Sequence, residues 1–214
     1  MLVPKDHPFG SKRLPCETGY YDVYNLDNVL LVNVREAPIE RITPKGVETS
    51  EAEYELDVII FATGYDAGTG SLTRIDIQGE AGQKIKEKYS GGPRTFMGLQ
   101  SAGFPNLFIM PGAGAGNFTR GCEPLVEWIT DCIGYMRENE YTRISATPEA
   151  EEEWTQYVAQ ASENLLRTKA NSWFVGANLP GKARVLLGSP DSAPVMRAKR
   201  SEIAANGYQG FLLQ

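Results

Sequence analysis

The sequence predicts an α/β fold with buried parallel strands, and three observations point to it. The run Leu56–Ala62 is continuously apolar and rich in β-branched residues, which is typical of a strand covered on both faces. A second apolar strand, Asn106–Met110, leads into a small-residue loop, Pro111–Gly116, and then into residues at helical spacing. The first strand also ends in small residues, Ala62-Thr63-Gly64, so the two turns are expected to border a crevice at the carboxyl edge of a sheet.

The N-terminal half is expected to contain short elements separated by turns. Residues 1–19 are punctuated by Pro and Gly and are expected to be irregular. A short helix or turn should precede a strand at Val29–Val34, and two short strands, Ile39–Ile42 and Gly46–Thr49, should flank a Pro-Lys-Gly turn. Residues 67–95 are polar and Gly-rich, which predicts a surface excursion.

The C-terminal half is expected to be mainly helical. Apolar residues recur at helical spacing over Glu123–Asn139. A second helix is predicted over Pro148–Leu166, with Thr147 as its N-cap and acidic residues in its first turn. A short strand at Arg184–Leu187 and a helix at Ala193–Asn206 are expected after it.

Composition and charge exclude several classes of protein. The chain has 214 residues, and its net charge of -6 argues against a general nucleic-acid binder, which needs clustered Lys and Arg on the phosphates. The short basic run Arg197, Lys199 and Arg200 is interpreted as a solvated face. No apolar run approaches the roughly 18 residues of a membrane helix, and the first ten residues lack the apolar core of a signal peptide, so a cytoplasmic location is expected.

Cysteine and histidine usage argues against a metal site. Cys16, Cys122 and Cys132 are widely spaced, and in a reducing compartment they are expected to be free thiols. His7 is the single histidine, so neither a zinc site nor a Ser-His-Asp mechanism is favoured.

The glycine-rich turn before the helix at residue 123 has two interpretations. Gly112 and Gly114 give GxG, but Asn117 occupies the third position and no strand ending in an acid follows at the distance that a dinucleotide fingerprint requires. The residues are therefore compatible with a tight strand-to-helix turn. They are also compatible with a backbone that approaches a planar or anionic ligand at a helix N-terminus, where a nucleotide cofactor would lie.

Longer stretches of the sequence resemble one family of enzymes. The segments 8–33, 42–79 and 92–112 are similar to the Baeyer–Villiger monooxygenases, the flavin-dependent class that includes the cyclohexanone and phenylacetone enzymes. SWFVGANLPGK at 172–182 and NGYQGF at 206–211 are similar to C-terminal signatures of that family. The resemblance covers nearly the whole chain.

The resemblance implies part of a Rossmann-like flavoprotein with two dinucleotide-binding domains, one for FAD and one for NADPH. Residues 1–55 match the returning half of the NADPH-binding domain, and residues 56–214 match the C-terminal half of the FAD-binding domain. The GxGxxG motifs and the FxGxxxHxxxW signature of the family have no counterpart here. The chain is therefore expected to correspond to the C-terminal portion, with association to itself or to a missing N-terminal part.

The resemblance also implies roles for single residues. Arg13 matches the catalytic arginine, which faces the negative charge that develops on oxygen beside the flavin, and Arg cannot lose its proton there. Lys12 matches the lysine that pairs with the 2'-phosphate of NADPH as a point charge. Trp173 matches the tryptophan that contacts NADP and helps to close the substrate pocket.

Two backbone segments are expected to lie against FAD. Gly116, Asn117 and Phe118 match the segment along the flavin, where a helix N-terminus stabilises negative charge on the reduced ring. The turn Ala62-Thr63-Gly64 matches the place where the chain crosses back into the FAD domain and lets cofactor atoms pack against its backbone.

The expected function is the insertion of one oxygen atom from O2 next to a ketone carbonyl, which gives an ester or a lactone at the expense of NADPH. One alternative is a sister flavin monooxygenase that hydroxylates nitrogen or sulfur, although Lys12-Arg13 with the 172–182 signature favours ketone chemistry. Another is a non-catalytic fragment that binds no flavin. Residues 112–127 replace a longer Ser/Pro-rich loop of many relatives, and residues 184–196 lack the expected aromatic-glycine pattern, so the ketone is left open.

Overall fold

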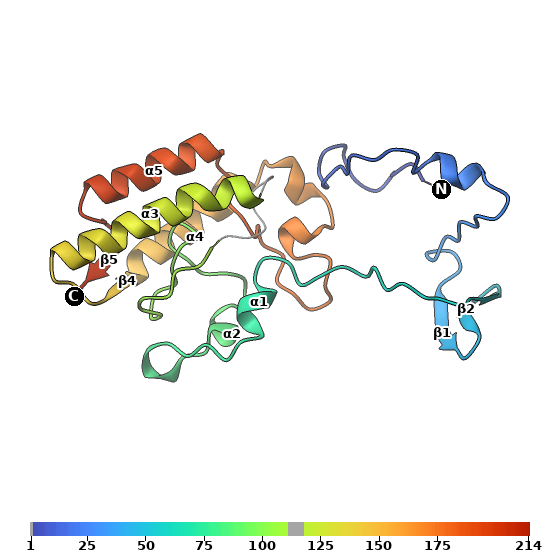
Figure 1. Cartoon of the computed structure of the whole chain (residues 1–214), viewed down its shortest axis with the longest axis horizontal. Coiled ribbons are helices and arrows are strands. Elements are labelled where there is room, and N and C mark those ends of the chain that lie inside the picture. The colour runs from blue at the N-terminus through green and yellow to red at the C-terminus, as the bar shows by residue number, and fades with distance from the viewer. Residues whose placement is uncertain (1, 111–117) are drawn as a thin grey trace. The chain divides into compact units, whose positions relative to one another are not determined.

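The computed structural model describes residues 2–110 and 118–214, without the side chains of Phe118 and Arg120, and is drawn in Figure 1. The chain divides into two compact units. The first unit contains the residues up to Asp6 together with Arg13–Gly64, and the second contains His7–Lys12 together with Tyr65–Gln214. Each unit is described by itself.

The first unit is built around a small antiparallel sheet. Its strands β1 (Ile39–Thr43), β2 (Gly46–Thr49) and β3 (Glu53–Glu55) pair in the order β1-β2-β3, after a single 3-10 turn, η1 (Asp22–Asn25). The β1–β2 turn forms because the Thr43 hydroxyl accepts hydrogen bonds from the backbone N–H groups of Lys45 at 3.2 Å and Gly46 at 3.1 Å. The predicted strands at 39–42 and 46–49 and the short helix before them are confirmed.

The first unit buries little apolar surface. Among its described residues, Ala37 is the one hydrophobic side chain in the buried core. Val58, Ile60 and Phe61 are all exposed, and Ile60 reaches 85%. A protein domain normally gains most of its stability from apolar burial, so this unit is expected to be much less stable than the second.

Two predicted strands, Val29–Val34 and Leu56–Ala62, are not strands in the structure. A strand is defined by hydrogen bonds to a neighbour, and a strand buried on both faces also needs layers above and below it. The described residues supply neither for these segments. The parallel sheet predicted from these runs is therefore absent from the described part of the chain, which is a mixed α/β structure with antiparallel pairing.

Two further predicted strands are also wrong. Residues 106–110 make single, scattered hydrogen bonds instead of a ladder: Asn106 N–H donates to Ile144 O at 2.8 Å and Ile109 N–H to Leu99 O at 2.7 Å. Residues 184–187 are irregular and form no ladder. Their Leu187 N–H donates to the carbonyl oxygen of Phe174, which lies in a turn earlier in the chain. The loop expected at 111–116 lies outside the described residues.

The second unit is organised by three helices, α3 (Phe118–Glu138), α4 (Pro148–Ser162) and α5 (Ala193–Ala205). The apolar stripe of α3 packs against the C-terminal segment in one core. This core contains Leu125, Trp128, Cys132, Met136, Met196, Tyr208 and Phe211. A two-stranded antiparallel sheet, β4 (Ile144–Ala146) with β5 (Phe211–Leu213), closes the end of the unit near the C-terminus (Figure 1).

The helix predictions hold with shifted boundaries. Helix α3 begins five residues before the predicted start, and α4 ends at Ser162 because the chain then turns into η3 (Leu166–Lys169). Thr147 caps α4 as expected, since its side chain accepts a hydrogen bond from Ala150 N–H at 3.2 Å. Helix α5 matches its prediction to one residue.

The segment expected to be a surface excursion carries part of a second core. It folds into α1 (Gly70–Thr73), η2 (Glu80–Gly82) and α2 (Ile85–Lys88). Ile85 and Tyr89 are buried and pack with Phe104. Ile85 and Tyr89 are isolated apolar residues in a polar, Gly-rich segment, so the composition gave no sign that they are buried. The prediction of a surface segment is therefore wrong for α2 and for the residue that follows it.

Residues 2–110 and 118–214 form no helix that is long and apolar enough to cross a bilayer. The same residues contain no group of three His, Cys, Asp or Glu side chains placed to hold a metal ion.

Candidate functional site

The turn that leads to Lys12 and Arg13 is fixed by its own hydrogen bonds. Ser11 is fully buried, and its backbone N–H and its hydroxyl both donate to the Pro8 carbonyl oxygen, at 3.2 and 2.6 Å. Gly10 adopts φ +77°, a conformation that favours glycine. Lys12 then lies half-buried at the end of its segment of the second unit, and Arg13, exposed, begins the main segment of the first.

Lys12 and Arg13 are cations without an acidic partner among the described residues. The ion pairs of the described chain involve other side chains, from Arg35–Asp6 to Lys199–Asp191. Because no carboxylate neutralises them there, both charges are free to act on an anionic ligand.

Trp173 begins a short 3-10 turn, η4 (Trp173–Val175), in the second unit. Its half-buried indole packs on the Phe174 ring with centroids 4.0 Å apart and planes at 31°. Gly176 ends the turn at φ +70° and donates its N–H to the Trp173 carbonyl oxygen at 3.2 Å. The adjacent Ser172 hydroxyl is buried and has no hydrogen-bond partner among the residues that the structure describes, so it retains capacity for a ligand.

The turn Ala62-Thr63-Gly64 is exposed, irregular backbone in the first unit. Gly64 adopts φ +91°, and a Cβ atom at this position would meet nothing within 4 Å. Open space beside a left-handed glycine is what close approach of a ligand to the backbone requires. Gly116 and Asn117 lie outside the described residues, and Phe118 is the first residue of α3.

The expected site residues are therefore divided between the two units. Arg13 and Ala62-Thr63-Gly64 belong to the first, whereas Lys12, Phe118 and Trp173 belong to the second. Their assembly around shared cofactors stays a prediction.

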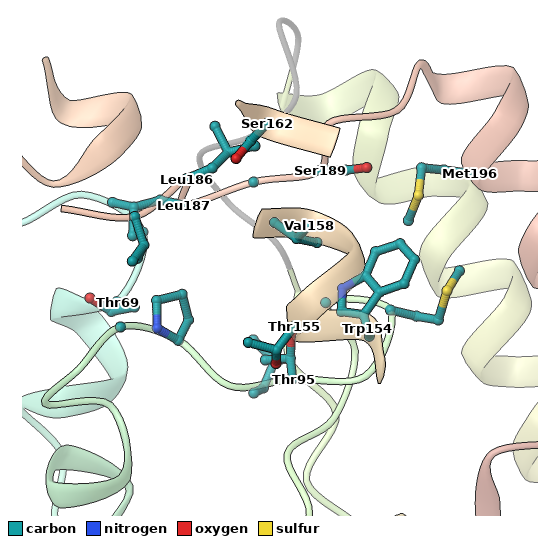
Figure 2. Close-up of a pocket in the computed structure, with 18 of the residues that line it drawn as sticks. Thr69, Thr95, Trp154, Thr155, Val158, Ser162, Leu186, Leu187, Ser189 and Met196 are labelled. Atoms are coloured by element: carbon teal, nitrogen blue, oxygen red, sulfur yellow. The ribbon is translucent and has the colours of Figure 1, made fainter. Parts of the chain in front are cut away.

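The second unit also contains a cavity of about 1390 Å³ that the sequence did not predict (Figure 2). One wall is a face of α4, with Trp154, Thr155, Val158 and Ser162. Thr69, Thr95, Leu186, Leu187 and Met196 contribute from other segments of the same unit. The residues of α4 recur at helical spacing, and this stripe of small and apolar side chains is the sequence signal that could have revealed the wall.

A polar cluster joins α4 to α5 at the edge of this cavity. Asp191 accepts hydrogen bonds from the Tyr157 hydroxyl at 2.6 Å and from Lys199 Nζ at 2.8 Å, and Lys199 Nζ lies 3.8 Å from the Tyr157 ring centroid. Burial raises the pKa of Asp191, but the hydrogen bonds from Lys199 and Tyr157 outweigh burial and hold the pKa below its ordinary value. Burial likewise lowers the pKa of Lys199, yet its bonds to Asp191 and Tyr157 raise the pKa overall.

This cluster corrects the interpretation of the basic run as a solvated face. Lys199 is half-buried and paired, and Arg200 is half-buried at the cavity, where burial and the neighbouring Arg197 lower its pKa. The cavity can hold an apolar molecule with a polar group, since its apolar walls are joined by hydroxyl and guanidinium groups.

The relatives found by comparison with known proteins are all named as monooxygenases. No family model matches the sequence. The chain is 43% identical, over 99% of its length, to the 2-oxo-Delta(3)-4,5,5-trimethylcyclopentenylacetyl-CoA monooxygenase of Pseudomonas putida. It is also 43% identical, over 99% of its length, to the cyclopentanone 1,2-monooxygenase of a Comamonas species, and 35% identical to the phenazine N-monooxygenase PhzNO1 of Lysobacter antibioticus.

Solved structures agree with these relatives. A crystal structure of OTEMO in complex with FAD and NADP matches all of this chain with a TM-score of 0.90 and 43% identity. The closed crystal structure of cyclohexanone monooxygenase matches 95% of the chain with a TM-score of 0.91 and 42% identity. The chain spans about 40% of the length of these relatives.

Proposed function

Because this chain belongs to the Baeyer–Villiger monooxygenase family, we propose that it forms the C-terminal part of an FAD- and NADPH-dependent enzyme that converts ketones to esters or lactones. The proposal includes the Rossmann-like architecture with two dinucleotide-binding domains. The observation that carries it is 43% identity to a cyclopentanone monooxygenase over 99% of the chain. The resemblance of the sequence implies that Lys12, Arg13 and Trp173 stand where the chemistry of the family would need them.

Lys12 and Trp173 would hold NADPH. Lys12 offers an ammonium without a carboxylate partner in the described chain, which suits the 2'-phosphate that distinguishes NADPH from NADH. Trp173 offers a flat, half-buried indole, and the unpaired Ser172 hydroxyl beside it can donate or accept one hydrogen bond.

Arg13 would stabilise negative charge on oxygen during the reaction. A guanidinium keeps its proton at any pH at which the protein is folded, so its charge is present throughout turnover. Such a permanent charge, aimed at a developing anion in a site without water, is among the largest contributions to catalysis. Arg13 is exposed and has no ion pair with the described residues, which leaves its charge available for this role.

FAD would lie against the Ala62-Thr63-Gly64 turn and the start of α3. When bound, FAD would be the group that reacts with O2, and NADPH would be the source of the electrons. The space beside Gly64 would leave room for cofactor atoms. The N-terminus of the 21-residue helix α3 would offer the positive end of its dipole to negative charge on the flavin.

The ketone would enter the cavity of the second unit. Apolar walls from Trp154, Val158 and Leu186 suit a hydrocarbon skeleton, while Thr69, Thr95 and Thr155 offer hydroxyl groups to a carbonyl oxygen. The cavity excludes bulk water from the bound ketone more effectively than an open surface would.

One observation favours a second function. The 35% identity to a phenazine N-monooxygenase extends over 99% of the chain, so the same scaffold also occurs in a protein named for oxidation of nitrogen. A third alternative is a non-catalytic module that binds no flavin. Colour separates this module from both enzymes, because a purified flavoprotein is yellow.

The test uses the purified protein that carries this chain, with cyclopentanone as the probe ketone. One cyclopentanone, one O2, one NADPH and one proton should give one lactone, one water and one NADP⁺. The visible flavin spectrum and lactone yield are measured together. A colourless protein, or a yellow protein that oxidises a phenazine and never a ketone, would reject the proposal.

A variant tests the NADPH contact. Lys12→Ala should raise the KM for NADPH far more than that for NADH, because only NADPH carries the 2'-phosphate. An equal rise for both nucleotides would contradict the contact.

A further inference from the structure

Two segments of the second unit that lie more than a hundred residues apart are tied together by three polar contacts. The Lys182 ammonium forms an ion pair with the Asp66 carboxylate. The same ammonium donates to the Ala67 carbonyl oxygen at 2.8 Å. Asn178 Nδ2 donates to the Tyr65 carbonyl oxygen at 3.0 Å. The loop that follows Trp173 is therefore fastened to the residues directly after the Ala62-Thr63-Gly64 turn.

The ion pair is largely removed from water. The Lys182 side chain is 15% exposed and the Asp66 side chain 27% exposed. An exposed pair would be screened by solvent and contribute little. Removing one partner from a pair that is mostly buried leaves the other charge poorly solvated, so this contact holds its segments more strongly.

Two glycines leave the space that the pair occupies. A Cβ atom on Gly70 would lie 2.5 Å from Cγ of Asp66. A Cβ atom on Gly176 would lie 2.8 Å from the Ala183 carbonyl oxygen and 3.3 Å from Cγ of Lys182. Any larger residue at position 70 would push the Asp66 carboxylate away from its partner.

The contacts at 178 and 182 reach Trp173 through the short hydrogen-bonded loop between them. Ala177 N–H donates to the Ser172 carbonyl oxygen at 3.0 Å, which closes the turn around Trp173. On the other side, Leu187 N–H donates to the Phe174 carbonyl oxygen at 2.9 Å. The turn that carries the indole is thus held at both ends, and Lys182 and Asn178 add the contacts that join its loop to residues 65–67.

We propose that Asp66 and Lys182, with the Asn178 amide, are positioning residues that latch the Trp173 turn in place and so hold the indole ready for NADPH. The role for NADPH rests on the proposed function, whereas the latch itself does not. The latch also gives a role to Asn178 and Lys182, for which the family resemblance supplied none. Neither residue needs to touch a cofactor or a substrate for this role.

The latch is tested by hydrogen exchange of the backbone amides in residues 172–183, measured on the purified protein. Asp66→Asn and Lys182→Met should each speed exchange about tenfold, because a charge-assisted contact is lost and opening becomes easier. Lys86→Met is the matched control: Lys86 is an exposed lysine that lines a small pocket together with Asp66 and Lys182, and it has no ion pair in the described chain. It should leave exchange in these residues unchanged.

A double variant and a glycine variant separate the latch from general destabilisation. Asp66→Asn with Lys182→Met should exchange no faster than either single variant, because two residues of one contact are not additive. Gly70→Ala keeps both charges but displaces the carboxylate, and it should mimic Asp66→Asn. Exchange in α3 should stay at the wild-type rate in every variant, since none of the substituted residues belongs to its core.

The role for NADPH is tested by kinetics on the flavin-loaded protein. Lys182→Met should raise the KM for NADPH about tenfold and change kcat less than about twofold, as expected for lost binding energy. Exchange that is unchanged in residues 172–183 would overturn the latch. Faster exchange with an unchanged KM would overturn the role for NADPH. A wild-type protein that never oxidises NADPH would contradict the proposed function while the exchange result still decides the latch.

Discussion

The carboxylate of Glu151 is the buried charge whose removal should damage the second unit most. Its side chain is 5% exposed, and its ion-pair partner Lys88 is 10% exposed, with Oε2 and Nζ 2.8 Å apart. Glu151 Oε1 also accepts from Ala102 N–H at 2.9 Å, while Lys88 Nζ donates to the Ala102 carbonyl oxygen at 2.7 Å. The pair therefore joins α4 to α2 and to the loop around residue 102.

The change Glu151→Gln should cost about 3 kcal/mol, the lower end of the range for breaking a buried pair, because the amide oxygen can still accept from Ala102. With a urea m-value of about 2 kcal/mol/M, the unfolding midpoint should fall by about 1.5 M. Tryptophan fluorescence is the assay, since all three tryptophans, Trp128, Trp154 and Trp173, belong to the second unit.

The neighbouring residue provides the control. Glu152 pairs with Arg94, but its side chain is 47% exposed, so Glu152→Gln should cost less than about 1 kcal/mol. Glu151→Gln with Lys88→Gln removes both charges and keeps an amide toward each of the two Ala102 groups, so it should cost less than Glu151→Gln alone. A Glu151→Gln midpoint equal to that of Glu152→Gln would refute the reasoning.

The remaining predictions concern the core, the first unit and the polar cluster. Burial raises the pKa of the Cys132 thiol to about 12, so iodoacetamide at pH 8 should label the exposed Cys16 and spare Cys132 until the protein unfolds; equal rates would contradict the packing. Limited proteolysis should cut Arg13–Gly64 first, because that unit buries so little apolar surface, and earlier cuts in α3 or α5 would argue otherwise. Asp191→Asn should destabilise the protein at neutral pH by about 1 kcal/mol. Because the folded-state pKa of Asp191 is lowered, the wild-type advantage should be present above the unfolded pKa of about 3.9 and vanish as the pH falls through the folded value; a gap that persists in acid would oppose this assignment.

The helices could be predicted because each is specified by residues within itself. The spacing of Leu125, Trp128, Cys132 and Met136 defines the buried face of α3, and Thr147 with its acidic neighbours defines the start of α4. Both signals lie within one helix, so a helix can be predicted from them without knowing which other element it packs against.

Strands could be predicted only where their partner is adjacent in the sequence. β1 and β2 are joined by a tight turn, whereas β4 and β5 have three residues each and pair across more than sixty residues of chain. The run at 56–62 has the composition of a buried strand, but composition does not supply the neighbour that would pair with it. The apolar pattern was interpreted as that of a strand covered on both faces, but Val58, Ile60 and Phe61 are exposed in the structure.

The same limit applies to the candidate site. Lys12, Arg13 and Trp173 were found by resemblance, since a Lys-Arg pair in a Pro/Gly loop is ordinary surface charge on its own. The contact of Lys182 with Asp66 joins residues that are 116 positions apart, so no local sequence pattern could have predicted it.

The measurement that tests the account most directly is the ratio of lactone formed to NADPH consumed by the Arg13→Ala variant of the flavin-loaded protein. Loss of the permanent cation should abolish lactone formation from cyclopentanone, while NADPH oxidation continues largely intact, so the ratio falls toward zero. A variant that still gives one lactone per NADPH would show that the guanidinium at position 13 is not the group that stabilises the reacting oxygen.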